Sequence, residues 1–171
     1  VPQKGVLFSG DIASNIMFGN SHGSDDEMIE AAEIAQATEF IDTKPEKYKS
    51  PISQGGANVS GGQKQRLSIA RAIAKHPDVY IFDDSFSALD YKTDATLRAE
   101  LKEKTAESTV MIVAQRISTI LHADQIIVLE DGQIVGKGTH KELLKNCEAY
   151  YQIASSQLSE KELEEDLKEV E

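Results

Sequence analysis

Two short apolar segments with a helical segment between them constrain the fold of this chain more than any other feature. Residues 79–82 read VYIF and residues 109–114 read TVMIVA, and neither alternates with polar residues, which is typical of strands buried on both faces. Between them, Asp90 can cap a helix in which Leu97 and Leu101 share one face. A strand, a helix and a second strand in this order predict two parallel strands joined by a crossover helix.

The flanking segments carry further helix and turn signals. An S-x-x-E capping box at residues 24–27 precedes an apolar helical stripe, and we expect that helix to continue to about Ile41. Ser60 can cap another helix, which Pro77 ends. Asp-Gly at residues 131–132 separates two β-rich runs and predicts a hairpin.

These elements together predict an α/β domain with a largely parallel sheet. The number of buried strands is low for that architecture, and the sequence begins with Val1 rather than methionine. We therefore expect the chain to be a fragment of a longer one that lacks sheet strands at its N-terminus. A fragment of this kind would leave apolar surface uncovered or paired with another copy of the chain.

Charge and cysteine content exclude several classes of protein. The formal net charge is −11 over 171 residues, which argues against a nucleic-acid partner because such a partner needs a basic face. The single cysteine, Cys147, rules out an intramolecular disulfide and suits a reducing compartment. No apolar run approaches the roughly 20 residues that cross a bilayer, so we expect the fragment itself to be soluble. Residues 160–171 are strongly acidic and predict an exposed helix or frayed end.

A serine and two glycines stand directly before the second capped helix. Residues 60–63 read SGGQ and are called the Ser-Gly turn below. A helix N-terminus has unpaired N–H groups and a partial positive charge, and glycines let an anion approach it closely. The turn therefore indicates a phosphate site, although a plain serine N-cap explains the same residues.

Two adjacent carboxylates, Asp83 and Asp84, follow the first apolar segment. Ligands collect at the carboxyl edge of a parallel sheet, and an aspartate at a strand end is a usual ligand of Mg²⁺. The alternative is that both acids only cap a turn.

Other charged residues indicate no site. His76, His122 and His140 have no metal-ligand spacing and are expected at the surface or in turns. Arg66 and Arg71 lie on the helix after the Ser-Gly turn, and its charged face is expected to be solvated.

The order of these motifs resembles the nucleotide-binding domain of ATP-binding cassette (ABC) transporters of the exporter type. Gln3, in VPQ, matches the Q-loop glutamine, and VSGGQ matches the signature motif, usually written LSGGQ. VYIFDD matches Walker B, SALD matches the D-loop and VAQRISTI matches the switch region. The segments LFSGDIASNIMFGN and LEDGQIVGKGTHKELL are also similar to exporter sequences. The resemblance covers residue 1 to about Ser155, and five ordered motifs make it specific.

The resemblance implies a partial P-loop NTPase (RecA-like) core with an α-helical signature subdomain. Residues 1–10 would form the Q-loop and residues 11–76 the helical subdomain. Residues 77–148 would form the C-terminal half of the core, and residues 149–171 an acidic helix and tail.

ATP and Mg²⁺ are the cofactors that the resemblance implies, with Gln3 and Asp83 as Mg²⁺ ligands. The signature residues would contact the γ-phosphate of ATP held by a second nucleotide-binding domain: Ser60, Gly61, Gly62 and Gln63. The D-loop residues Ser87 and Asp90 would carry information between the two ATP sites.

Three departures from the family pattern concern catalysis. The sequence contains no Walker A motif, G-x-x-x-x-G-K-[ST], so the chain alone is not expected to hold ATP tightly or to be an active enzyme. Asp84 stands where the family usually has the glutamate that activates water, and it is one methylene shorter. Gln115 stands at the switch position, usually histidine, and it cannot carry a proton charge near neutral pH. Both changes resemble the degenerate half of a heterodimeric, multidrug-type exporter.

The resemblance therefore implies the ATP-binding and ATP-hydrolysing part of an exporter at the cytoplasmic face of a membrane. Its partners would be a second nucleotide-binding domain and the transmembrane domains of the transporter. One alternative is a non-hydrolysing module in which ATP drives only dimerisation and coupling. Another is a soluble ABC protein of DNA repair or translation, which the exporter-like GTHKELL segment and the lack of basic patches disfavour.

Overall fold

The computed structural model describes residues 1–168, and the chain divides into two compact units with separate hydrophobic cores, Val1–Val113 and Ala114–Glu171. The first unit contains β1 (Gly10–Asp11), α1 (Ile12–Ile16), η1 (Met17–Gly19), α2 (Asp25–Ile34), α3 (Thr38–Asp42), η2 (Lys47–Lys49), β2 (Pro51–Ile52), η3 (Gln54–Gly56), α4 (Gly61–Ala74), β3 (Val79–Asp83), α5 (Tyr91–Lys104) and β4 (Thr109–Val113). The second contains α6 (Ile117–Ile120), β5 (Ile126–Glu130), β6 (Gln133–Gly138), α7 (His140–Asn146), α8 (Glu148–Ser155) and α9 (Glu160–Lys168). Residues 169–171, the end of the predicted acidic tail, lie outside the described residues.

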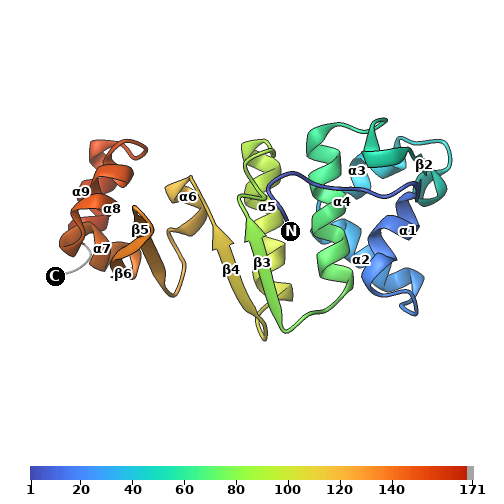
Figure 1. The fold of residues 1–171 in the computed structure, drawn as a ribbon. Coiled ribbons are helices and arrows are strands. Elements are labelled where there is room, and N and C mark those ends of the chain that lie inside the picture. Colours follow the sequence, from blue (N-terminus) through green and yellow to red (C-terminus); the bar gives the residue numbers. More distant parts are fainter. Residues whose placement is uncertain (169–171) are drawn as a thin grey trace. The chain divides into compact units, whose positions relative to one another are not determined.

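The predicted strand–helix–strand unit is confirmed. Strands β3 and β4 pair in parallel, with Val79 opposite Thr109 and Asp83 opposite Val113, and α5 connects them (Figure 1). The Asp90 carboxylate caps α5 by accepting a hydrogen bond from the Thr93 N–H at 3.0 Å. The carboxyl end of β3 therefore leads directly into the loop that precedes α5.

The prediction that both strands are buried on both faces is wrong for the described part of the chain. Neighbouring side chains of a strand point to opposite faces, and only one face of this pair is covered. Tyr80 and Phe82 are buried in the same core as Leu97 of α5. The opposite face carries four side chains that are 51–56 % exposed: Val79, Ile81, Met111 and Val113. A run of apolar residues in the sequence shows that both faces are apolar, but not that both are covered.

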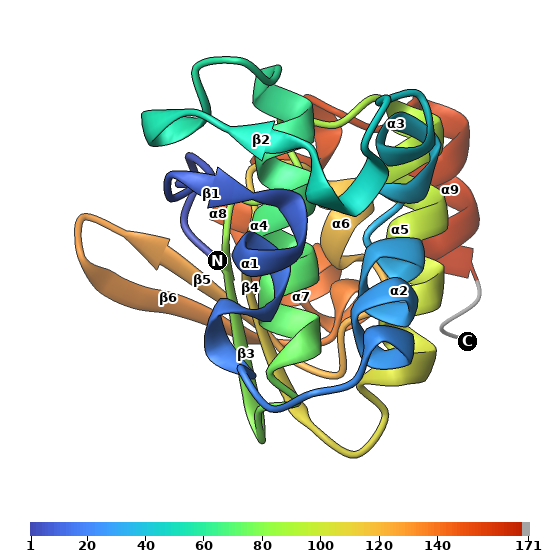
Figure 2. The same ribbon diagram turned by 90° about the vertical axis from the view of Figure 1, so that its right-hand side faces the viewer.

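The helical layer packs around α4. Helices α1 and α2 contact α4, and α2 also lies beside α5 (Figure 2). The helix expected to continue to Ile41 is interrupted, because α2 ends at Ile34 and the backbone enters the left-handed region at Gln36 (φ 55°) before α3. The predicted end of α4 before Pro77 is confirmed. The buried side chains of these helices and of β3 belong to one continuous core.

Arg71 of α4 does not lie on a solvated face, contrary to the sequence-based expectation. Its guanidinium donates hydrogen bonds to the Asn15 backbone carbonyl (2.8 Å), the Asn15 Oδ1 (2.8 Å) and the Val6 carbonyl (2.9 Å). It also lies 4.9 Å from the ring centre of Phe8 and 5.9 Å from that of Phe18. Arg66 likewise donates to the Gln36 carbonyl at 2.8 Å. The long stems and planar heads of both arginines let them join backbone segments at the edge of the core.

The second unit is built on the predicted hairpin. Strands β5 and β6 pair antiparallel, and the turn residues Asp131 and Gly132 both have positive φ (48° and 77°), as a two-residue hairpin turn requires. His140 at the start of α7 is buried and contacts the Tyr150 hydroxyl through Nδ1 (2.7 Å), so its expected surface position is wrong. Its Nε2 lies 3.1 Å from Asp166 of α9. Burial, followed by the negative charge of Asp166, raises the pKa of Tyr150 to about 12.

Carboxylates at helix starts should make the fold sensitive to acid. Hydrogen bonds lower the pKa of five carboxylates: Asp11, Glu27, Asp90, Glu142 and Glu162. The largest cause is a bond from a backbone N–H group in the first four and a bond from the Ser159 hydroxyl in Glu162. Because each folded pKa lies below its unfolded value, this stabilisation is complete above the unfolded pKa and is lost as pH falls through the folded one. We expect the urea midpoint to be level from pH 7 to about 5 and to fall towards pH 3.

A matched variant checks this pH dependence. Asp90→Asn keeps an oxygen that can accept the Thr93 N–H but no longer titrates. Its urea midpoint should fall less between pH 5 and 3 than that of the unmodified chain. Equal losses in the two proteins would show that the Asp90 cap does not contribute to acid sensitivity.

Candidate active site

The first residues of the chain lie beside the carboxyl end of β3. The Val1 amino group donates to the Ile81 carbonyl (2.7 Å), and the Asp83 N–H donates to the Val1 carbonyl (3.0 Å). The hydroxyl of Ser85, which is fully buried, donates to the same Val1 carbonyl (2.9 Å). The two backbone bonds of Val1 form the pattern of a parallel neighbouring strand. It fixes the start of the chain at the end of β3 that carries the two carboxylates.

Gln3 and Asp84 meet at this end of β3. The Gln3 side-chain amide, Nε2, donates to Asp84 Oδ2 at 3.0 Å. The backbone of Asp84 has a φ of 44°, a left-handed conformation that aspartate and asparagine tolerate better than most residues. The Asp84 N–H also donates to the Val113 carbonyl of β4 at 2.9 Å. The sequence pattern placed both side chains at one site, and the structure brings them into contact.

Asp83 and Gln3 have the chemistry of Mg²⁺ ligands. Asp83 is an exposed carboxylate at the strand end, and the bond between Gln3 Nε2 and Asp84 leaves the Gln3 Oε1 oxygen available as a ligand. Mg²⁺ prefers oxygen ligands and usually takes only one or two from the protein, with water and phosphate completing its shell. The described residues hold no cluster of three or more His, Cys, Asp or Glu side chains that could hold a metal. The residues therefore fit an ion held mainly by phosphate oxygens rather than by a protein cage.

The Ser-Gly turn forms the N-terminus of α4. Ser60 Oγ accepts the Gln63 N–H at 3.2 Å, and Gln63 Oε1 accepts the Ser60 N–H at 3.1 Å, which is a complete capping box. The N-cap role is therefore real, but it uses only acceptor oxygens of the two side chains. The Ser60 hydroxyl proton and the Gln63 Nε2 hydrogens remain as donors. Ser60 and Gly61 are exposed, so these donors and the helix terminus face solvent.

The turn lies next to the loop between β3 and α5. A Cβ atom built on Gly62 would be 3.5 Å from the Ala88 carbonyl oxygen, whereas one on Gly61 would meet nothing within 4 Å. Within the loop, the Ser87 hydroxyl donates to the Asp84 carbonyl at 2.9 Å. Residues 87–90 thus connect the Asp84 backbone to the neighbourhood of the Ser-Gly turn within one compact unit.

Gln115 belongs to the second unit. Its backbone carbonyl accepts a hydrogen bond from Gln157 Nε2 at 2.9 Å, and Gln157 Oε1 accepts the Ile117 N–H at 2.9 Å. The side chain of Gln157 therefore holds the segment that presents Gln115 on the surface of its unit. Sequence reasoning missed Gln157, because a contact over 42 residues leaves no local pattern.

Comparison with known proteins identifies the family. Residues 1–87, half of the chain, match the family described as ABC transporter. The chain belongs to the ABC transporter family. The matched part contains Gln3, the Ser-Gly turn, Asp83 and Asp84.

Relatives of this ABC chain include several bacterial proteins. It is 46 % identical over 160 residues to a Mycobacterium tuberculosis protein named as an uncharacterized ABC transporter ATP-binding protein. It is 42 % identical over 157 residues to a Staphylococcus aureus protein named as a candidate multidrug export ATP-binding/permease protein. Each match covers 92 % of this chain and 27 % of the relative. The chain therefore spans about a quarter of the length of these curated relatives.

A solved structure confirms the fold class of this ABC chain. The chain superposes on a bacterial Atm1-family ABC exporter with ATP bound, with a TM-score of 0.89 and 35 % identity, over 94 % of this chain and 28 % of that one. The predicted α/β fold, a partial P-loop NTPase core with a helical subdomain, is confirmed by this likeness. The finer division into four segments by residue number stays a prediction.

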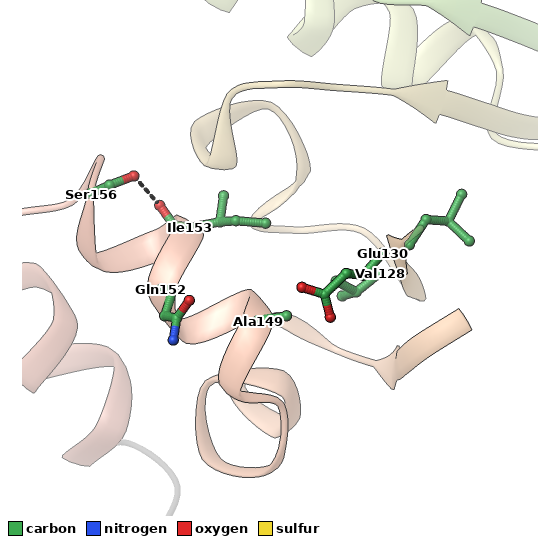
Figure 3. Close-up of a pocket in the computed structure, with 7 residues that line it drawn as sticks. Val128, Glu130, Ala149, Gln152, Ile153 and Ser156 are labelled. Carbon is green, nitrogen blue, oxygen red and sulfur yellow. Dashed lines mark hydrogen bonds between the residues drawn. The ribbon is translucent and has the colours of Figure 1, made fainter. Parts of the chain in front are cut away.

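A pocket of about 300 Å³ lies between β5 and α8 of the second unit, where Ser156 Oγ donates to the Ile153 carbonyl at 2.7 Å (Figure 3). Its lining includes none of the predicted site residues.

Among the described residues, no helix has both the length and the apolar character needed to cross a bilayer.

Proposed function

We propose that this chain supplies half of each of two ATP sites in an ABC exporter. The observation that carries the proposal is the presence, in one compact unit, of an exposed helix N-terminus with available donors at the Ser-Gly turn and of a separate Gln3–Asp83–Asp84 group. One helix N-terminus does not enclose a triphosphate, so another surface must supply the rest of the phosphate cage around the Ser-Gly turn. ATP would then join this chain to a second nucleotide-binding domain. We call the completed assembly of the two nucleotide-binding domains and their membrane domains the assembled pair, with the nucleotide-binding domains at the cytoplasmic face of the membrane.

The Ser-Gly turn would complete the ATP site of the partner domain. Ser60 contributes a hydroxyl donor, Gln63 an amide donor, and the α4 terminus a partial positive charge, all towards the γ-phosphate. Gly61 leaves room for the phosphate, since nothing lies within 4 Å of the position that a Cβ would take. These residues are intact relative to the family motif except for the leading valine, so we expect the partner's site to turn over ATP.

The other site would contain Gln3, Asp83 and Asp84. Bound Mg²⁺ would neutralise phosphate charge as ATP is cleaved. Asp83 and Gln3 would hold the ion, and Asp84 would orient the attacking water. Because Asp84 is one methylene shorter than the usual glutamate, its carboxylate stands about 1 Å from the best position, which can slow a reaction about 10²-fold. Gln115 can donate a hydrogen bond to the γ-phosphate but cannot carry a positive charge. We therefore infer slow hydrolysis at this site.

A second candidate function is a module that binds ATP to dimerise and couple, without hydrolysis. The pair Asp84 and Gln115 favours it for this chain's own site. The intact Ser-Gly turn disfavours it for the assembly as a whole. ATP turnover by the assembled pair separates the two functions, because only the exporter ATPase gives sustained release of phosphate.

Restoring the usual catalytic residues tests the asymmetry of the two sites. In the assembled pair, Asp84→Glu combined with Gln115→His should raise single-site hydrolysis by up to about 10²-fold. The measurement is ATP turnover with the partner's catalytic residue disabled, so that only this chain's own site is observed. The backbone at position 84 is left-handed (φ 44°), a conformation that glutamate adopts less readily than aspartate. We therefore expect the glutamate variant to lose a little stability.

The matched control is Asp42→Glu, which makes the same aspartate-to-glutamate change at an exposed position outside the ATP motifs and leaves both catalytic positions unchanged. Its single-site turnover should stay at the level of the unmodified pair. If the double variant hydrolyses no faster than this control, residues 84 and 115 do not limit the site, and the proposed asymmetry is wrong.

A further inference from the structure

The start of the chain is attached to α4 by a buried side chain that belongs to no recognised motif. Gln65 of α4 is 1 % exposed, and its Nε2 donates to the Pro2 carbonyl at 3.1 Å. Pro2 directly precedes Gln3, and Gln65 stands two residues after Gln63 of the Ser-Gly turn. A buried amide that is bonded to the backbone fixes position more strictly than apolar contact does, because the bond has a preferred length and direction.

Gly5 brings the same segment against the backbone of α4. A Cβ atom at Gly5 would lie 2.8 Å from the Lys64 carbonyl oxygen and 2.9 Å from Ser68 Oγ. A side chain at this position is therefore excluded unless the segment moves away. One residue later, the Val6 carbonyl accepts a hydrogen bond from Arg71 Nη1 at 2.9 Å. The first residues of the chain thus lie against α4 where they cross it (Figure 1), with contacts at Pro2, Gly5 and Val6.

The same segment is also attached to the end of β3. Val1 exchanges hydrogen bonds with Ile81 and Asp83, and Gln3 donates to Asp84. Gln3 therefore lies between two anchors, the carboxyl end of β3 and the side chain of Gln65. A displacement of the first turns of α4 would be transmitted to Pro2 and from there to Gln3.

We propose that Gln65 is a positioning residue that couples Gln3 to the Ser-Gly turn. The inference rests on the proposed function, in which the turn contacts the partner's ATP and Gln3 belongs to this chain's own site. A phosphate bound at the turn holds the start of α4 in place, and Gln65 then holds Gln3 where its Oε1 can bind Mg²⁺. Because coupling free energies are reciprocal, Mg²⁺ with ATP at this chain's site also favours phosphate binding by the turn.

Hydrogen exchange in the 171-residue chain tests the attachment without any nucleotide. Gln65→Met is close in volume and removes only the donor. We expect the Asp83 amide, which is bonded to Val1, to exchange about tenfold faster in this variant, as the loss of one buried hydrogen bond predicts. The control Ile69→Val trims a buried side chain of α4 without touching Pro2. It should not speed exchange of the Asp83 amide more than exchange of the amides of α4.

Mg²⁺ dependence in the assembled pair tests the coupling. With single-site turnover as the readout, Gln65→Met should raise the Mg²⁺ concentration for half-maximal activity about tenfold, while Ile69→Val leaves it unchanged. In a Gln3→Ala background, Gln65→Met should add no further effect, because Gln65 acts through Gln3. Additive effects of the two substitutions would overturn the positioning role.

The outcomes separate this inference from the proposed function. Unchanged exchange at Asp83 in Gln65→Met overturns the attachment, whether or not the assembly is an ATPase. Normal ATP turnover with an unchanged Mg²⁺ dependence overturns the coupling and leaves the proposed function intact. Failure of the unmodified pair to bind ATP overturns the proposed function and the coupling with it. Hydrogen exchange at Asp83 then still tests whether Gln65 attaches Pro2 to α4.

Discussion

Ser60→Asp is expected to lower ATP turnover by the assembled pair about 10²- to 10³-fold, the effect of removing one donor from a charge-stabilising site. Aspartate replaces serine as an N-cap without loss of helix stability, so α4 should remain folded with its cap on the Gln63 N–H. The substitution removes the hydroxyl donor and places a negative charge towards the γ-phosphate. Turnover at saturating ATP, together with urea unfolding of the chain itself, measures the effect and shows that it is not caused by unfolding.

Ser24→Asp is the matched control for this result. Ser24 caps α2 through its hydroxyl oxygen in the same way that Ser60 caps α4, but it belongs to no ATP motif. Turnover of the Ser24→Asp pair should stay within about twofold of the unmodified pair. A loss of similar size in both variants would assign the effect to the helix caps rather than to phosphate binding.

Arg71→Met is expected to give the largest loss of stability of any single substitution that we propose, about 3 kcal/mol. Methionine keeps much of the stem but removes three charge-assisted hydrogen bonds to Asn15 and Val6. Asn15 is 1 % exposed, so its Oδ1 loses a partner that water replaces poorly. Equilibrium urea unfolding followed by circular dichroism gives the difference in the free energy of unfolding.

Lys47→Met is the control for the loss of a cation. Lys47 and its ion-pair partner Asp42 are 64 % and 63 % exposed, and exposed pairs contribute little to stability. The change in unfolding free energy should stay within about 0.5 kcal/mol. If Arg71→Met costs no more than Lys47→Met, the hydrogen bonds of Arg71 do not hold the first helix to α4.

The local elements of the fold were predictable because their signals are local. The capping box at residues 24–27, the cap at Asp90 and the turn at residues 131–132 each depend on residues within one turn of each other. The alternation of apolar segments and a helix was enough to predict the parallel pairing of β3 and β4. The left-handed break at Gln36 was not predictable, since no glycine or proline marks it.

The site was predictable only as far as motifs reach. The pattern placed Gln3 and Asp84 together, and their 3.0 Å contact agrees with it. It could not show that Gln65 and Arg71 attach the first residues to α4, because these contacts span 63 and 65 residues. Nor could it separate a solvated arginine from one that joins backbone segments, since both look the same in a helical pattern.

The most direct test of the account is a structure of the assembled pair with nucleotide trapped at both sites. The account predicts that Ser60 Oγ and the Gly62 N–H lie within hydrogen-bond distance, about 3 Å, of γ-phosphate oxygens bound by the partner domain. It also predicts Asp83 and Gln3 at the metal of the opposite site. Ser60 and Gly62 directed away from the terminal phosphate would contradict the account.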